Sequence, residues 1–301
     1  MGGTNVKCGL VSLDGSVISR THLITASFIS DKNQLIHALC GVCLQLLQKN
    51  HLEKKDILGV GIGLPGLVDV PKGVVKFLPN IPGWENVALK NIMEKKIKIP
   101  VFLDNDVNVI TLGEWRFGAG IGITDLVCLT LGTGVGGGLI LNNALYRGPG
   151  FTAGELGHIP LNEEGPSCNC GGRGCLERVV GNKYLLEKAQ KIFGKRDLTL
   201  EEVDGLADQE NSAALKFWKE TAAHIGVGLV GVVNLLNPKR IIIGGGIAKA
   251  HRHLFPVILQ TIRKRAMSVP ASMVQLRRAK LGDRAGIMGA RVLVDQVIYA
   301  R

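Results

Sequence analysis

The chain has 301 residues, 46% hydrophobic and 20% charged, which is enough for the core of two medium-sized lobes in an ordinary globular protein. The net charge of +11 is spread along the chain, with short clusters only at 263–265 and 277–278, so a solvated basic surface is expected rather than a nucleic-acid partner. The start has no signal-peptide pattern, and the most apolar helical stretch, 222–237, is too short and too glycine-rich for a membrane span. We therefore expect a cytoplasmic protein with no membrane partner.

Predicted elements of the first hundred residues combine a strand hairpin with a helix and two buried strands. In chain order they are the hairpin at 6–13 and 16–20, the helix at 31–49 with Ser30 as its N-cap, and short apolar strands at 57–62 and 100–103. Each of the two short strands ends in a loop rich in glycine or acidic residues. Such loops at strand ends are common places for functional side chains.

The rest of the chain alternates strands with helices around one unusual insertion. In chain order it predicts a second hairpin at 125–131 and 135–141, a glycine- and cysteine-rich insertion at 148–181, helices up to 237, a strand at 240–243, a helix at 251–265, a strand at 274–281 and a terminal helix after 283. This alternation predicts a mixed α/β fold in which helices cover the sheets. The forty glycines cluster at the ends of apolar runs, which suggests backbone loops that approach a ligand.

Three glycine-rich loops at strand ends could bind phosphate through their backbone N–H groups. They are Gly2, Gly3, Thr4 and Asn5; Gly132, Thr133 and Gly134; and Gly244, Gly245 and Gly246. None has the spacing of a P-loop or of a dinucleotide-binding fingerprint. A glycine turn in a hairpin needs no ligand, so each loop alone is weak evidence, but three in one chain favour a nucleotide.

Three polar residues, Asp104, Asn105 and Asp106, lie between an apolar strand and a helical pattern. Asp and Asn are preferred N-caps, so one of them is expected to cap the helix. A carboxylate at the end of a strand can also accept the proton of an attacking hydroxyl. From these residues alone, helix capping and general-base catalysis remain equally open.

Four potential metal ligands lie within eighteen residues: His158, Cys168, Cys170 and Cys175. Zinc takes four such ligands tetrahedrally, and a complete protein shell is typical of a structural ion. Three free thiols in a glycine-rich loop are the alternative, but exposed thiolates are reactive. The seven cysteines therefore predict a reducing compartment and one structural Zn²⁺ site rather than a disulfide framework.

Taken together, these motifs resemble the ROK family (repressors, open reading frames, sugar kinases), and its bacterial glucokinases in particular. The resemblance runs almost end to end and rests on the segments 2–5, 61–69, 79–80 with Trp84, 105–106, 131–136, 154–158, 168–177 and 244–246. It implies an α/β, two-lobed, actin-like ATPase (ribonuclease H-like) fold with a cleft between the lobes, a hexose substrate, and ATP with Mg²⁺ as phosphoryl donor. Its lobes would be a small one at 1–106, completed by the helix at 285–301, and a large one at 107–284 carrying the zinc-binding insertion.

The same resemblance assigns roles to individual residues. Asp106 matches the family's catalytic base, which would take the proton of the sugar's 6-hydroxyl as it attacks the γ-phosphate. The positions that match sugar-contacting residues are Gly66, Asn105, Glu155, His158 and Glu177. His158 would serve zinc and sugar through its two ring nitrogens. The resemblance also suggests a homodimer.

One departure from the family pattern concerns the first loop, which the family precedes with an aspartate that helps to place magnesium. Met1 stands one residue ahead of Gly2, so we expect the natural protein to start several residues earlier. Glucose is the expected substrate, with N-acetylmannosamine, N-acetylglucosamine, fructose or allose as alternatives. A sugar-sensing transcriptional regulator is the rival function; such regulators carry a DNA-binding segment ahead of the kinase-like part, so we expect a kinase here. A catalytically weak sugar-binding remnant is a further rival, because of the missing aspartate.

Overall fold

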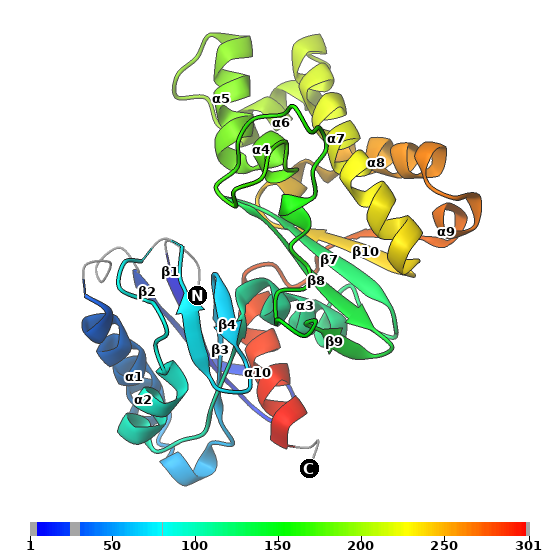
Figure 1. Ribbon diagram of the computed structural model, residues 1–301. Helices are drawn as coiled ribbons and strands as arrows, with labels where there is room; N and C mark the ends of the chain where they lie inside the picture. The colour runs from blue at the N-terminus through cyan, green and yellow to red at the C-terminus, as the bar shows by residue number, and fades with distance from the viewer. Residues whose placement is uncertain (1–4, 25–30, 80, 299–301) are drawn as a thin grey trace. The chain divides into compact units, whose positions relative to one another are not determined.

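The computed structural model of the chain describes residues 5–24, 31–79 and 81–298 (Figure 1). The chain divides into two compact units. Unit 1 comprises Met1–Gly122, Leu145–Ala153 and Asp283–Arg301, and unit 2 comprises Ile123–Ala144 and Gly154–Gly282. Gly2, Gly3 and Thr4 of the first predicted phosphate loop lie outside the described residues.

Within the residues that the structure describes, unit 1 contains three pairs of strands. The hairpin β1 (Asn5–Val11) and β2 (Val17–Ile24) is antiparallel, β3 (Val60–Leu64) pairs in parallel with β6 (Val101–Asn105), and β4 (Leu67–Asp69) pairs antiparallel with β5 (Val74–Phe77). Its helices are α1 (Lys32–Lys49), η2 (Lys54–Asp56), α2 (Leu89–Ile97), α3 (Asp106–Phe117) and α10 (Ala285–Ile298). Helices α1 and α2 cover one face of the strands and α3 and α10 the other (Figure 1).

Close packing of α3 against α10 explains why unit 1 continues beyond residue 106. A Cβ at Gly113 in α3 would overlap the carbonyl oxygen of Ala285, and a Cβ at Gly289 in α10 would overlap that of Val109. Only glycine allows two helix backbones to approach this closely. The structure thus groups α3 with the N-terminal elements and α10, whereas the predicted lobe boundary placed it in the large lobe.

Helix α1 buries the apolar stripe that its sequence predicts, including Leu35, Leu39 and Val42. Its N-cap, however, is Asp31, whose carboxylate accepts hydrogen bonds from the N–H groups of Asn33 (2.8 Å) and Gln34 (3.4 Å). The prediction of Ser30 as the cap was wrong by one residue. An aspartate one position later satisfies the same unpaired N–H groups and adds a negative charge at the positive end of the helix.

The main sheet of unit 2 has five strands in the order β11-β10-β7-β8-β9, and two residues of its edge strand β9, Leu145 and Tyr146, are counted with unit 1. Its strands are β7 (Leu126–Leu131), β8 (Val135–Leu141), β9 (Ala144–Tyr146), β10 (Arg240–Gly244) and β11 (Gln275–Arg278). β7, β10 and β11 are parallel, and β7 and β8 form the predicted antiparallel hairpin. Parallel neighbours bring their carboxyl ends to one edge of the sheet, and two of the predicted phosphate loops follow β7 and β10 there.

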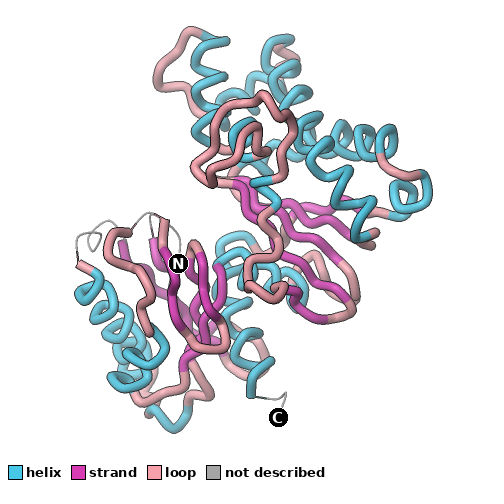
Figure 2. Tube along the Cα trace, viewed as in Figure 1, coloured by secondary structure: helices cyan, strands magenta, loops and turns pink. Residues whose placement is uncertain are grey.

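Helices make up most of the remainder of unit 2 (Figure 2). They are η3 (Leu156–His158), α4 (Glu177–Val180), α5 (Asn182–Phe193), α6 (Leu200–Asp208), α7 (Ser212–Leu236), η4 (Ile247–Ala250), α8 (His251–Arg265) and α9 (Ser268–Met273), with η5 (Gly282–Arg284) where the chain returns to unit 1. In the parts of the chain that the structure describes, no helix is long and apolar enough to cross a membrane.

Candidate functional site

The corner between β6 and α3 gives its three polar residues three different tasks. Asn105 is the N-cap of α3: its Oδ1 accepts from the N–H groups of Val107 (2.9 Å) and Asn108 (3.3 Å). Asp104 is fully buried and accepts hydrogen bonds from the Asn105 N–H (2.7 Å) and the Asn108 side chain (2.9 Å). Capping therefore occupies Asn105 and structural hydrogen bonds occupy Asp104, which leaves Asp106 as the candidate base.

Asp106 is the first residue of α3 and is partly buried. Burial raises the pKa of its carboxyl above the usual value for an aspartate, and the backbone N–H of Val107 opposes that rise. A carboxylate with a raised pKa is a stronger base than an exposed one. The second interpretation of this motif, general-base catalysis, therefore fits Asp106.

Gly66 lies in the turn between β3 and β4, and Asn105 holds that turn. The Asn105 Nδ2 donates to the carbonyl oxygen of Gly66 at 3.2 Å. Gly66 has φ +91°, and a Cβ there would overlap the carbonyl oxygen of Phe77. These two predicted sugar-contacting residues are thus brought together in unit 1 by one of the two amide N–H groups of Asn105.

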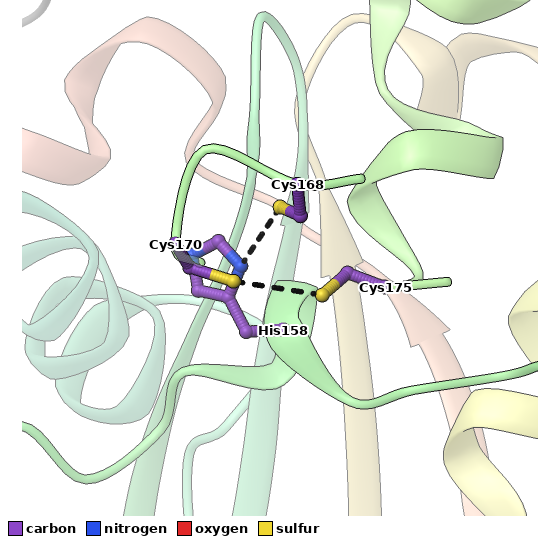
Figure 3. Close-up of side chains that lie close together, drawn as sticks. All are labelled: His158, Cys168, Cys170 and Cys175. Atoms are coloured by element: carbon purple, nitrogen blue, oxygen red, sulfur yellow. Dashed lines mark hydrogen bonds between the residues drawn. The ribbon is translucent and has the colours of Figure 1, made fainter. Parts of the chain in front are cut away.

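The four predicted metal ligands of unit 2 converge, as Figure 3 shows. One donor atom from each of His158, Cys168, Cys170 and Cys175 lies within 4.8 Å of every other. The His158 Nδ1 is 3.7 Å from the Cys168 Sγ, and the Sγ atoms of Cys170 and Cys175 are 3.6 Å apart. The last distance is far longer than a disulfide bond, so the cysteines are free thiols.

These distances match the edges of a tetrahedron around zinc. Ligand distances of about 2.3 Å to sulfur and about 2.0–2.1 Å to nitrogen place two sulfurs about 3.8 Å apart and a sulfur and nitrogen about 3.6 Å apart. Burial and the neighbouring thiols raise the pKa of Cys175 to about 12, so the thiols cannot all ionise together without a cation. The donor set and its spacing therefore fit a zinc ion.

A tight backbone turn shapes the loop that carries the three cysteines, residues 168–175. The N–H of Cys168 donates to Gly172 at 2.8 Å and the N–H of Gly171 donates to Cys168 at 3.0 Å. Gly171 and Gly174 both have positive φ, of +90° and +62°. These left-handed residues let the loop wrap between its candidate ligands.

The other ring nitrogen of His158 faces Glu155. The distance from the His158 Nε2 to the Glu155 carboxylate is 3.9 Å, while Nδ1 points to the thiols. The turn that carries both residues is seated on β8 by glycines: a Cβ at Gly137 would overlap the carbonyl of Gly154, and a Cβ at Gly157 would overlap that of Val135. The backbone contacts therefore fix where these two side chains stand in unit 2.

Glu177 follows the cysteine-bearing loop of residues 168–175 and contacts the glycine loop between β7 and β8. Its Oε2 accepts from the N–H of Val135 at 2.8 Å, and a Cβ at Gly134 would lie 2.6 Å from the same oxygen. The loop is closed by a hydrogen bond from the N–H of Gly132 to the carbonyl of Gly134 at 3.0 Å. Glu177 therefore holds the phosphate-loop candidate of residues 132–134 with one of its carboxylate oxygens.

The third glycine loop lies at the same edge of the sheet. Gly244 ends β10 opposite Thr130 of β7, and Gly245, with φ +90°, packs against the end of β7 where a Cβ would overlap the carbonyl of Leu131. The loops at 132–134 and 244–246 are thus neighbours in unit 2. Asn5, from the first loop, is an exposed residue at the start of β1 in unit 1.

Sequence reasoning missed one charged residue near the candidate base. Arg147 lies in the segment Leu145–Ala153 of unit 1, and its Nε and Nη2 both lie 2.7 Å from the Oδ2 of Asp104. The two residues are 43 positions apart, so no local pattern links them. The sequence did offer one clue: Asp104 ends an apolar strand, and an acid buried there requires a hydrogen-bonding or cationic partner somewhere in the fold.

Comparisons with known proteins agree with these motifs. Over residues 1–297 the chain matches the ROK family. A glucokinase of Halalkalibacterium halodurans is 34% identical over 311 residues, which cover 98% of this chain and 93% of that protein. A xylose repressor of Caldicellulosiruptor bescii is 32% identical over 283 residues, covering 89% of this chain and 71% of the repressor.

The similarity extends to three dimensions. A ROK family glucokinase from Streptomyces griseus, solved in complex with glucose and AMPPNP, is 31% identical, and the match covers 98% of this chain and 97% of that one with a TM-score of 0.83. The arrangement of strands and helices is therefore shared. The chain belongs to the ROK family and has that family's actin-like ATPase fold, as its motifs predicted.

Proposed function

We propose that this chain is an ATP-dependent hexose kinase that phosphorylates the 6-hydroxyl of glucose. The observation that carries the proposal is the β6–α3 corner, where capping and structural contacts occupy Asn105 and Asp104 and the carboxyl of Asp106 has a raised pKa. The glucokinase names of several relatives support the same reaction.

In the proposed reaction Asp106 accepts the proton of the sugar hydroxyl. The hydroxyl oxygen forms a bond to the γ-phosphorus of ATP, the bond from that phosphorus to the β,γ-bridging oxygen breaks, and ADP leaves. Phosphoryl transfer depends mainly on positioning and charge stabilisation, and Mg²⁺ bound with ATP would neutralise the phosphate charge. The chain's own part is to hold the hydroxyl and the proton acceptor in line.

We assign sugar recognition to the residues that match the family's sugar-contacting positions. The ring hydroxyls would be held by Gly66, Asn105, Glu155, His158 and Glu177. Carboxylates and amides suit this task because each can bind two adjacent hydroxyls, and a site built this way rejects analogues that lack one.

ATP would be bound by the adjacent glycine loops of unit 2. Gly132, Thr133 and Gly134 follow β7, and the glycines 244–246 follow β10, so backbone N–H groups and one hydroxyl are available at a single sheet edge. The first loop would add Asn5 and the residues before it. Gly132 and Gly246 have open space where a Cβ would be, which leaves room for phosphate oxygens.

The cluster of His158 and the three cysteines would hold a structural zinc ion. All four protein ligands are present, so the ion would have no open position for substrate and would act by fixing the ring of His158. Elemental analysis of the purified protein is expected to give one zinc per chain. We also propose that the protein forms a homodimer, which light scattering after gel filtration would measure.

A sugar-sensing regulator is the second candidate, favoured by the similarity to xylose repressors. A coupled assay of ADP release, run with MgATP and a panel of glucose, N-acetylmannosamine, N-acetylglucosamine, fructose and allose, separates the two. The kinase proposal expects the highest kcat/KM with glucose and its loss in Asp106→Asn. Glucose binding by calorimetry without turnover of any hexose would favour the regulator or an inactive remnant.

A further inference from the structure

The pair of Asp104 and Arg147 is built more tightly than its position in the chain requires. The side chain of Asp104 is only 1% exposed and that of Arg147 is 22% exposed. Both donors of Arg147 reach the same oxygen, Oδ2, at 2.7 Å each. The other oxygen, Oδ1, accepts from the backbone of Asn105 and the side chain of Asn108, so this carboxylate is satisfied on every side.

Burying an ion pair of this kind does little for stability by itself. Removing a carboxylate and a guanidinium from water costs about as much as their attraction returns, and apolar replacements are often as stable. The pair instead fixes the orientation of the Asp104 carboxylate, which accepts hydrogen bonds from residues on both sides of the strand-to-helix corner. Its Oδ1 links Asn105, the last residue of β6, to Asn108 in the first turn of α3.

Asp106 lies within that bracket. Asn105 holds the first turn of α3 and the turn at Gly66, and Asp104 holds Asn105 and Asn108. Hydrogen bonds therefore fix the residues on either side of Asp106. Among the described residues, the carboxylate of Asp106 itself accepts hydrogen bonds from backbone N–H groups and from no side chain. The corner therefore holds the backbone of Asp106 in place without a side-chain contact to the Asp106 carboxylate among the described residues.

Arg147 adds a second connection, through the chain. It opens a compact loop, closed by a hydrogen bond from the N–H of Ala153 to the carbonyl of Arg147 at 2.9 Å. Residues Leu145–Ala153 pack with unit 1, and the next residue, Gly154, begins the turn that carries Glu155 and His158. The ion pair thus ties the segment leading to the sugar-contacting turn to the corner that carries the base.

We propose that Arg147 and Asp104 are positioning residues for phosphoryl transfer, with Arg147 orienting Asp106 through Asp104. The proposal rests on the proposed function, in which Asp106 is the base. Arginine is required because its fork places two donors on one oxygen, whereas the ammonium of lysine is a single point charge. The pair acts on the geometry of the reacting groups rather than by touching the substrate.

The test compares kcat and KM of three variants by ADP release. Arg147→Met is expected to lower kcat about 100-fold, the loss typical of a displacement of about 1 Å at a reacting group, with the KM for ATP unchanged. Arg147→Lys keeps the charge and is expected to lose less. Asp106→Asn is the reference for the base itself: if it retains turnover, the proposed function fails whatever the Arg147 variants do.

Two control variants separate positioning from stability. Arg252→Met removes an exposed arginine that contacts Asp208 at 2.7 Å and is expected to keep the kcat of the wild type. Ile258→Ala empties a fully buried site in α8 and is expected to lower Tm while each folded molecule keeps its kcat. Wild-type kcat in folded Arg147→Met overturns the proposal, as does an equal loss of kcat in Ile258→Ala at matched Tm. If Arg147→Met does not fold, wild-type kcat in Arg147→Lys overturns it.

Discussion

The contact between Gly157 and β8 allows a sharp test of how the turn that carries Glu155 and His158 is held. In Gly157→Ala the new methyl group would lie 3.0 Å from both the carbonyl carbon and the Cβ of Val135, and closer still to the carbonyl oxygen. Ordinary contact begins at 3.4 Å, and the obstacle is backbone at the start of a strand. The turn and the strand must therefore separate by a distance on the order of 1 Å.

That separation displaces two groups at once. His158 is the next residue, so its Nδ1 would leave a ligand set that tolerates errors of about 0.2 Å. Val135 also donates its N–H to Glu177, so the carboxylate of this α4 residue loses its support as well. We expect zinc content below one per chain, kcat/KM for glucose lowered about 100-fold and a stability loss of about 1–3 kcal/mol.

The matched control is Gly205→Ala in α6, where nothing lies within 4 Å of the new methyl group. Alanine there is expected to stabilise the helix by up to about 1 kcal/mol and to leave the kinetics unchanged. Zinc by elemental analysis, Tm by calorimetry and kinetics by ADP release complete the assay. Full zinc occupancy and wild-type kcat/KM in Gly157→Ala would refute the reasoning.

Three further predictions follow from single contacts. Gly245→Ala forces a methyl group onto the carbonyl of Leu131 at a positive φ, so the KM for ATP is expected to rise while glucose affinity, by calorimetry without nucleotide, stays the same. Asp106→Asn is expected to raise Tm at neutral pH: burial raises the folded pKa, so ionisation costs wild-type stability as pH rises through that value, and the neutral amide avoids this loss. A Tm difference that does not shrink at low pH would contradict this. Asp31→Ala removes the cap of α1 and is expected to cost about 1 kcal/mol in urea unfolding, with no change in kcat.

Local sequence patterns were sufficient for most of the fold. Apolar runs beside glycine turns predicted strands at 125–131, 135–141 and 240–243, and the structure has them at 126–131, 135–141 and 240–244. The helix predicted at 251–265 has those bounds in the structure. These elements are bounded by residues that change backbone preference within one or two positions. The three-residue strands β4 and β9 were not predicted, because so short a run has no measurable period.

The contacts of the candidate site that could be predicted are those between residues close together in the sequence. The clustering of His158 and the three cysteines could be predicted because they lie within eighteen residues and share one chemistry. The contacts of Asp104 with Arg147 and of Glu177 with Val135 could not be, because the partners are 43 and 42 positions apart. A hydrogen bond between distant segments depends on how whole helices and strands pack. The local sequence pattern around either partner therefore does not predict it.

The glycines fall into two groups, those required by close packing and those with no packing reason to be glycine. Their number suggested loops that approach a ligand, yet a Cβ at Gly61, Gly113 or Gly289 would overlap the backbone of a neighbouring helix. Those glycines are explained by close packing alone. Gly132 and Gly246 differ, because a Cβ there would meet open space. A glycine with no packing reason, placed at a strand end, is the better indicator of a ligand, and these two positions therefore carry the case for the nucleotide.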